Sequence, residues 1–199
     1  MRGDWSDERL MLAYRAGDAD AFDALYRRYR GSLYRYLAQQ CGNPALADEL
    51  YQDIWIKVVK ARADYEPLAR FSTWIYRIAH HRLIDHYRRH ALPTAAHFAG
   101  NDHDDREEGG DGNDERILSL PAAGHETPHA LHERRTMAER IGLALADLPD
   151  HQREVFLLAE EGGLTLDEIA TATGCGRETA KSRMRYALNK LRHSLRDLL

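Results

Sequence analysis

Cysteine, proline and long apolar stretches are all scarce in this 199-residue sequence. The two cysteines, Cys41 and Cys175, lie far apart without the spacing of a zinc site, which favours a reducing cytoplasm over an oxidising compartment. No run is apolar enough for a membrane span, and no signal peptide precedes Trp5, so we expect no membrane insertion. Strand-forming patterns are few, while Ala, Leu, Arg and Glu dominate, so the sequence predicts an all-α fold.

The sequence also lacks the motifs of common enzymes. It contains no G-x-S-x-G, no Gly-rich phosphate-binding loop and no paired carboxylates in an apolar setting. We therefore expect neither an enzyme nor a bound cofactor.

Acidic residues are concentrated in one segment of the chain. The net charge is −4, but residues 91–133 hold ten acidic and two basic residues and carry −8, which leaves +4 for the rest. Residues 101–115 are rich in Gly and acids and contain no apolar side chain, so this part cannot bury a core. The pattern predicts two small helical domains, at 1–92 and 135–199, joined by an acidic flexible linker at 93–134.

A helix-turn-helix is predicted near the C-terminus. Thr165 and Glu168 form a capping box, so a helix should begin at Leu166. Gly174 suits the left-handed turn that ends it, and a second helix should follow from about Arg177. A short helix, a Gly-bearing turn and a second helix form the motif that places its second helix in a DNA groove.

The second of these helices has one apolar and one basic face. Its apolar stripe is Ala180, Met184, Ala187, Leu188, Leu191 and Leu195. Its opposite face holds Glu178, Lys181, Ser182, Arg185, Asn189 and Arg192. A basic polar face suits a major groove lined by phosphates, and the alternative is a solvated surface helix. The capping box and turn in front favour DNA.

Capping signals divide the N-terminal part into helices. Ser6 can cap a first helix that ends near residues 16–17, and Asp18 can cap a second that stops at 42–44. The second helix has an aromatic-rich apolar stripe, which is most simply core.

A third helix is predicted at 45–62, with a mixed outer face. Asp48, Gln52, Ile56 and Val59 fall within one quadrant away from the core. Apolar residues ringed by polar ones favour a protein-binding surface, whereas the alternative is that neighbouring helices cover them. Spacing alone leaves both open.

A fourth helix is predicted at 73–89, capped by Ser72, and it is rich in bases and aromatics. Cations interleaved with flat rings suit a single-stranded nucleic acid, because charge holds the backbone and rings stack on bases. The alternative is that the aromatics, Trp74 and Tyr76 above all, are core and the arginines a solvated face.

These segments together resemble a known family. Residues 48–55 and 71–89 resemble domain two of bacterial sigma factors, and residues 148–156 with the helix-turn-helix and 179–183 resemble domain four. The order and length are similar to the extracytoplasmic-function (ECF) group. The resemblance implies a transcription initiation factor that binds core RNA polymerase, at the β′ clamp helices and β flap, and reads the −10 and −35 elements of promoter DNA. It also implies an anti-sigma factor as a partner.

The resemblance assigns residues to each contact. Core polymerase would be bound by Asp48, Glu49, Gln52, Asp53, Ile56 and Val59. The −10 element would be read and opened by Tyr65, Trp74, His81, Arg82, Asp85, Tyr87, Arg88 and Arg89. The −35 element would be read by Arg177, Glu178, Thr179, Lys181, Ser182, Arg183, Arg185 and Asn189. Two positions depart from the family: His81 stands where Asn is frequent, and Gly176 begins the recognition helix where Ser or Pro is common.

Two other functional classes remain as alternatives. A free-standing helix-turn-helix regulator would use its N-terminal half as a sensor or dimerisation domain. A metal-binding protein would use the linker, where 111–115 hints at a calcium loop and His125, His129 and His132 have helical spacing. The loop lacks its sixth-position Gly and closing Glu, and no Cys supports the histidines, so solvated side chains are favoured.

Overall fold

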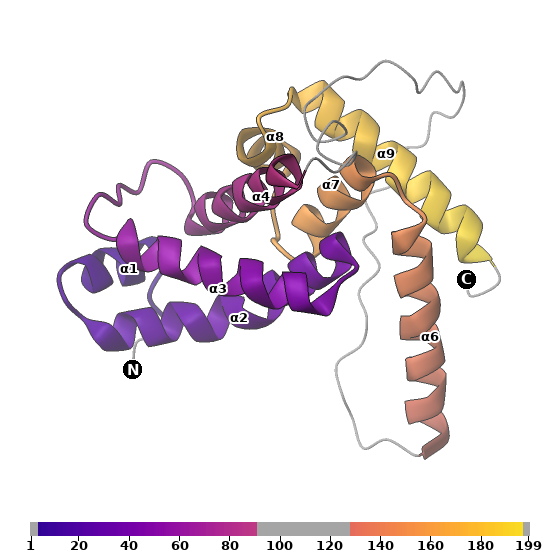
Figure 1. Cartoon of the computed structure of the whole chain (residues 1–199), viewed down its shortest axis with the longest axis horizontal. Coiled ribbons are helices and arrows are strands. Elements are labelled where there is room, and N and C mark those ends of the chain that lie inside the picture. The colour runs from indigo at the N-terminus through magenta and orange to yellow at the C-terminus, as the bar shows by residue number, and fades with distance from the viewer. Residues whose placement is uncertain (1–3, 91–127, 197–199) are drawn as a thin grey trace.

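The computed structural model describes residues 4–90 and 128–196, and gives side chains from residue 135 onward in the second range. Every regular element in these ranges is a helix, which confirms the predicted all-α fold for the described residues. The helices are α1 (Asp7–Arg15), α2 (Ala19–Cys41), α3 (Pro44–Lys60), α4 (Phe71–Arg89), α6 (Pro128–Ala146), α7 (Asp150–Glu160), α8 (Leu166–Thr173) and α9 (Arg177–Ser194) (Figure 1). None of them is long and apolar enough to cross a membrane. The acidic stretch 101–115 and His125 lie outside the described residues.

The predicted caps of the first two helices are confirmed. The Ser6 hydroxyl accepts a hydrogen bond from the Arg9 amide, and the Asp18 carboxylate accepts one from Ala21. Gly42 ends α2 with a φ of +61°, the left-handed conformation that glycine adopts without strain. Local chemistry therefore sets these helix ends.

The predicted start of the fourth helix is wrong. The helix begins at Phe71, with Arg70 at the cap position, and Ser72 lies buried inside its first turn. The Phe71 amide donates instead to Glu8 Oε1 at 2.8 Å, so an acceptor from α1 serves as the cap. A cap supplied from a distant helix leaves no local signal.

Two further boundaries differ from the prediction. Helix α3 ends at Lys60, two residues early, and its N-cap is Asn43. Helix α6, for which no start was predicted, begins at Pro128, so residues 128–134 of the expected linker are helical. Proline is well suited to the first position of a helix, because its missing N–H has no partner there anyway.

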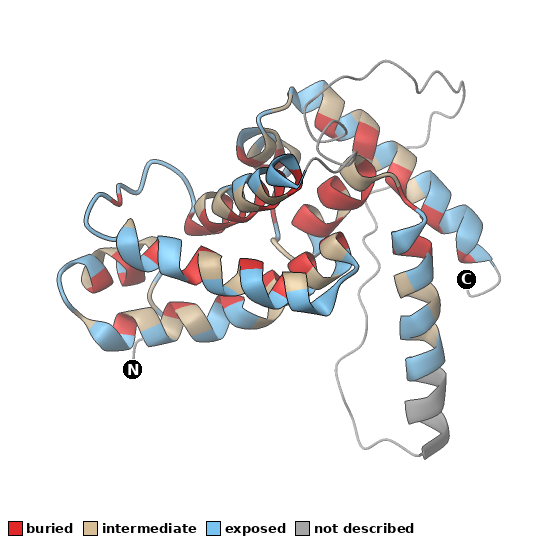
Figure 2. Cartoon of the chain, viewed as in Figure 1, coloured by how far each residue is buried: buried red, intermediate tan, exposed pale blue. Residues whose placement is uncertain are grey.

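Helices α1–α4 form an N-terminal unit around an aromatic-rich core. Leu10, Leu25, Ile54, Phe71 and Leu83 are completely or almost completely buried. Buried positions follow the inward faces of the helices, and exposed positions follow their outward faces (Figure 2). The aromatic stripe of α2 is thus core, as predicted.

Helices α6–α9 form a C-terminal unit. The Arg153 guanidinium, 8% exposed, donates to the carbonyls of Ala146 and Leu148 at 3.2 Å and thereby caps the end of α6. Helix α7 packs against α9, and α8 packs against both.

The two units pack directly on each other. Helix α8 packs against α4, and α7 contacts α2 (Figure 1). Polar groups join the units: Glu154 of α7 meets Tyr36 and His80, and the Gln40 amide donates to the carbonyl of Asp150 at 3.2 Å. No motif or helical spacing in the sequence predicts this contact.

Candidate nucleic-acid and protein interfaces

The predicted helix-turn-helix is present with the expected bounds. The Thr165 hydroxyl accepts from the Glu168 amide, and Glu168 Oε2 accepts from the Thr165 amide at 2.8 Å, which completes the capping box. Gly174 ends α8 at a φ of +72°. The extended backbone at Gly176 then starts α9 without a side-chain cap. This local chemistry fixes where the second helix of the motif begins.

One face of α9 is polar and exposed. Arg177, Glu178, Lys181, Arg185 and Asn189 are exposed, whereas Thr179 and Ser182 are half-buried. The Arg185 guanidinium lies 5.2 Å from the ring centroid of Tyr186, so an aromatic neighbour supports it. The exposed residues recur every three to four positions and share the side of α9 that faces away from the rest of the molecule (Figure 2).

Arg183 lies on the other side of α9, against the expectation that it faces DNA. Its side chain is only 6% exposed. It follows Ala180 by three residues and precedes Ala187 by four, and both alanines are completely buried. A spacing of about 100° per residue therefore places Arg183 on the inner stripe.

Acidic neighbours hold the first basic residues of α9. Arg177 Nε lies 2.8 Å from Asp167 of α8, and Lys181 lies 3.9 Å from Glu178. These side chains are all more than half exposed, so the pairs contribute little to stability. A phosphate or base edge can therefore replace the acids at small cost.

The outer face of α3 is open. Asp48, Glu49 and Gln52 are exposed, and the apolar side chains of Ile56 and Val59 are 49% and 40% exposed. No described helix covers them, so the alternative that neighbours bury this face is wrong. Exposed β-branched residues beside acids and an amide form a surface suited to a protein partner.

Asp53 is the exception on this face, because it is half-buried and forms an ion pair with Arg82 of α4. One residue assigned to polymerase thus contacts one assigned to DNA. The pair joins the two candidate surfaces of the N-terminal unit.

Helix α4 exposes part of its predicted DNA-reading set. His81, Asp85, Arg88 and Arg89 are exposed, and Trp74 is half-buried. Partial burial, with His80 and Arg77 nearby, lowers the pKa of His81, so its ring is neutral at pH 7. A neutral imidazole has one donor and one acceptor nitrogen, which suits a base edge.

Tyr65 and Tyr87 lie in the core, against the expectation that they face DNA. Tyr65 is 2% exposed, with its ring centroid 5.1 Å from that of Trp74 in an edge-on contact. Tyr87 is 6% exposed, and its hydroxyl donates to the carbonyl of Gln40. An aromatic residue in an amphipathic pattern looks the same in sequence whether it packs or stacks on a base, which explains the difference.

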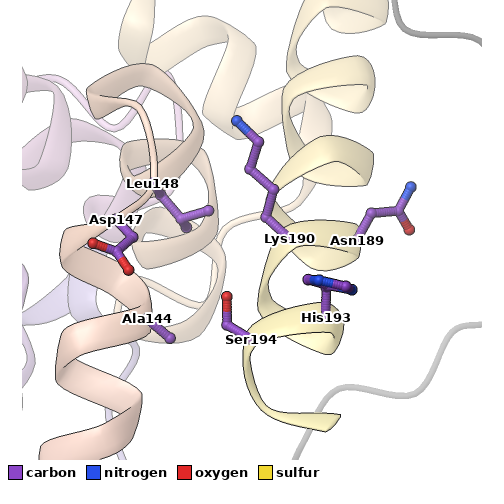
Figure 3. Close-up of a pocket in the computed structure, with 7 residues that line it drawn as sticks. All are labelled: Ala144, Asp147, Leu148, Asn189, Lys190, His193 and Ser194. Atoms are coloured by element: carbon purple, nitrogen blue, oxygen red, sulfur yellow. The ribbon is translucent and has the colours of Figure 1, made fainter.

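A small hollow lies between the end of α6 and the end of α9 (Figure 3). It measures about 240 Å³, and its lining is Ala144, Asp147, Leu148, Asn189, Lys190, His193 and Ser194. The described residues contain no group of three His, Cys, Asp or Glu side chains able to hold a metal ion. His129 and His132 lie in the part of α6 whose side chains are not described.

Comparisons with known proteins match both units. The family model for Sigma-70 region 2 matches residues 25–92, and that for Sigma-70, region 4 matches residues 144–193. The chain is 30% identical over 182 residues to ECF RNA polymerase sigma factor SigK of Mycolicibacterium vanbaalenii, covering 89% of this chain and 83% of that one. It is 29% identical to RNA polymerase sigma factor CarQ of Myxococcus xanthus, covering 94% and 97%.

Two solved structures share the fold. CnrH in complex with the cytosolic domain of CnrY has a TM-score of 0.64 at 20% identity, covering 96% of this chain and 97% of that one. The sigma factor RpoE of Bartonella quintana, in complex with the anti-sigma factor NepR, has a TM-score of 0.61 at 19% identity, covering 88% and 96%.

Proposed function

The chain belongs to the ECF group of RNA polymerase sigma factors, which direct polymerase to promoters, and we propose that α3, α4 and α9 divide its contacts among them. Helix α3 binds core polymerase, α4 reads the −10 element, and α9 reads the −35 element. Sigma factors are non-enzymatic initiation factors, and this one acts in the cytoplasm. The observation that supports the assignment is that each of the three helices presents an exposed face with the chemistry that its contact needs.

The core contact uses the outer face of α3. Ile56 and Val59 supply apolar area, while Asp48, Glu49 and Gln52 form a polar rim. This is the usual anatomy of a protein interface, with an apolar centre that loses water and a rim that stays hydrated. By family resemblance the partner is the pair of β′ clamp helices, and the C-terminal unit contacts the β flap.

The −35 contact uses the exposed face of α9. Arg185 lies mid-face, where a guanidinium can donate two hydrogen bonds to the N7 and O6 acceptors of guanine. Arg177 and Lys181, at the start of the helix, exchange their acidic neighbours for phosphates. Arg183 and the half-buried Thr179 and Ser182 have at most supporting roles.

The −10 contact uses the exposed end of α4. Arg88 and Arg89 neutralise the backbone of the melted strand, and the neutral ring of His81 reads a base. His81→Asn should shift the preferred base within the −10 element, because an amide presents a donor and an acceptor at different positions from an imidazole. Selection of promoter sequences by holoenzyme measures this, and an identical −10 preference would remove His81 from the reading site.

An anti-sigma factor is the expected regulator. The two solved neighbours are themselves complexes, one with CnrY and one with the anti-sigma factor NepR. We infer a regulatory partner of the same class for this chain.

Reconstituted transcription tests the proposal. The purified chain should co-elute with core polymerase and direct initiation at a defined start site, and core polymerase alone should not start there. The second candidate, a free-standing regulator, would instead bind palindromic duplex DNA without polymerase. If the chain does not direct core polymerase to a specific start site, the proposed functions of these three faces are rejected.

A further inference from the structure

The contact between the two units is incompatible with reading both promoter elements at once. Elements centred about 25 base pairs apart are separated by roughly 85 Å, at 3.4 Å per base pair. Helix α4 is only about 28 Å long and packs directly on α8, the first helix of the helix-turn-helix. If the proposed function is right, the units must therefore separate before the chain can span a promoter.

We propose that Glu154, Tyr36 and His80 form a lock that holds the free chain in this closed, self-inhibited arrangement. Glu154 belongs to α7 of the C-terminal unit, and its side chain is 2% exposed. Its Oε1 accepts a hydrogen bond from the Tyr36 hydroxyl at 3.0 Å and lies 2.6 Å from His80 Nδ1. Both partners belong to the N-terminal unit, where Tyr36 is fully buried and His80 is 3% exposed.

Further contacts between the two units surround the Glu154 carboxylate. The Tyr76 hydroxyl donates to the carbonyl of Glu161 at 3.0 Å. A Cβ on Gly162 would lie 2.5 Å from the Leu158 carbonyl oxygen of its own unit and 3.1 Å from Tyr76 Cε2 of the other unit, so the Tyr76 ring packs closely on this glycine. At the exposed rim, ion pairs join Arg35 to Glu161 at 2.7 Å, and Arg70, the residue before α4, to Glu168 of α8 at 3.4 Å.

The chemistry of the lock suits a contact that opens. A carboxylate is costly to bury and is stable there only while its partners remain, whereas in the open chain water solvates it. Burial and the nearby Glu154 raise the pKa of Tyr36 well above its ordinary value, so the hydroxyl stays protonated and donates. The closed state thus depends on matched polar partners, and removal of one of them should open the chain.

Two substitutions test the lock without enlarging any side chain. Tyr36→Phe removes one hydroxyl and keeps the ring, and Glu154→Gln removes the charge at constant volume. The matched control is Glu160→Gln, which removes the same charge from the same helix at an exposed position. A hydrogen bond to a charged group accounts for about a tenfold change or more in an equilibrium, so each lock variant should raise the open-to-closed ratio of the full chain about tenfold.

Single-molecule FRET on the full chain measures that ratio directly. Dyes are placed on cysteines at the exposed positions Asp23 of α2 and Lys190 of α9, in a chain in which Cys41 and Cys175 are replaced by alanine. The unsubstituted chain should show mainly the high-transfer population. Both lock variants should gain the low-transfer population, the control should not, and all four should keep the same helicity by circular dichroism.

The outcomes separate the lock from the proposed function. Equal transfer in the lock variants and the control would overturn the lock, as would a wild-type chain that is already open. A double substitution, Tyr36→Phe with Glu154→Gln, should open the chain by less than the product of the two single effects, because both act on the hydrogen bond between these side chains; independent effects would also count against the lock. Promoter-specific transcription is measured separately, and its absence would reject the proposed function while FRET still decides the lock.

Discussion

The most direct test of the polymerase contact is Ile56→Asp. Ile56 is 49% exposed on α3 and lies beside Val59, which is 40% exposed. Full burial of an isoleucine stabilises a complex by about 1.5–3 kcal/mol, so covering the exposed half is worth about 1 kcal/mol. An aspartate at this position loses that term and adds at least roughly 1–3 kcal/mol for an unsatisfied polar group in the interface. The sum, about 2–4 kcal/mol, corresponds to roughly 30-fold to 1000-fold weaker binding of core polymerase.

The assay is equilibrium binding of the labelled chain to core polymerase, read by fluorescence anisotropy. The matched control is Leu68→Asp, the same kind of change at an 87% exposed residue in the α3–α4 connection. Because Ile56 is outside the core, its variant should keep wild-type helicity and melting temperature. Loss of folding would show that Ile56 supports the core, and a dissociation constant equal to that of Leu68→Asp would refute the assignment of this face.

Three further changes test other parts of the molecule. Arg185→Ala should remove about 1–3 kcal/mol of discrimination at one or two adjacent −35 positions in a sequence-selection assay, whereas uniform weakening would indicate a phosphate contact. Cys41 is half-buried, and desolvation raises the pKa of its thiol to about 12, so at pH 8 a maleimide should modify Cys175 faster than Cys41 in a mass-spectrometric time course. Equal modification rates would contradict the raised pKa. Burial opposes ionisation of Glu168, but its hydrogen bonds with Thr165 outweigh this and lower its pKa below 4.5. A carboxylate whose pKa is lower in the folded than in the unfolded chain stabilises the fold at pH values above its unfolded pKa, and this contribution is lost as the pH falls through its folded pKa. The free energy of unfolding of the wild-type chain, measured in urea, should therefore decline below about pH 4.5, and that of Glu168→Gln should decline less.

The helix-turn-helix was predictable because its signals are local. Thr165, Glu168 and Gly174 lie within ten residues, and each acts on the backbone of its own helix. The same holds for Ser6 and Asp18. For α4 the cap comes from another helix, because Glu8 of α1 accepts a hydrogen bond from the Phe71 amide. The sequence therefore led to a wrong N-cap, since Ser72 has the side-chain chemistry of a cap but lies inside the first turn.

Family resemblance placed some residues on the wrong side of their helices, where helical phase would have helped. The resemblance assigned Arg183 to DNA, although its phase with Ala180 and Ala187 places it on the buried stripe. It also assigned Tyr65 and Tyr87 to the −10 element, and both pack in the core. Exposure of Ile56 and Val59, by contrast, depended on which helices pack against α3, which spacing within α3 cannot reveal.

The interface between the units was beyond sequence reasoning for a different reason. Glu154 follows a buried arginine in α7, and its partner Tyr36 lies 118 residues away. A charged residue on a helix is ordinarily assumed to face water, and the assumption fails only when several partners from another unit converge on it. It follows that substitutions at Glu154 should alter the separation of the units far more than the stability of either, which is the reverse of what its 2% exposure alone would suggest.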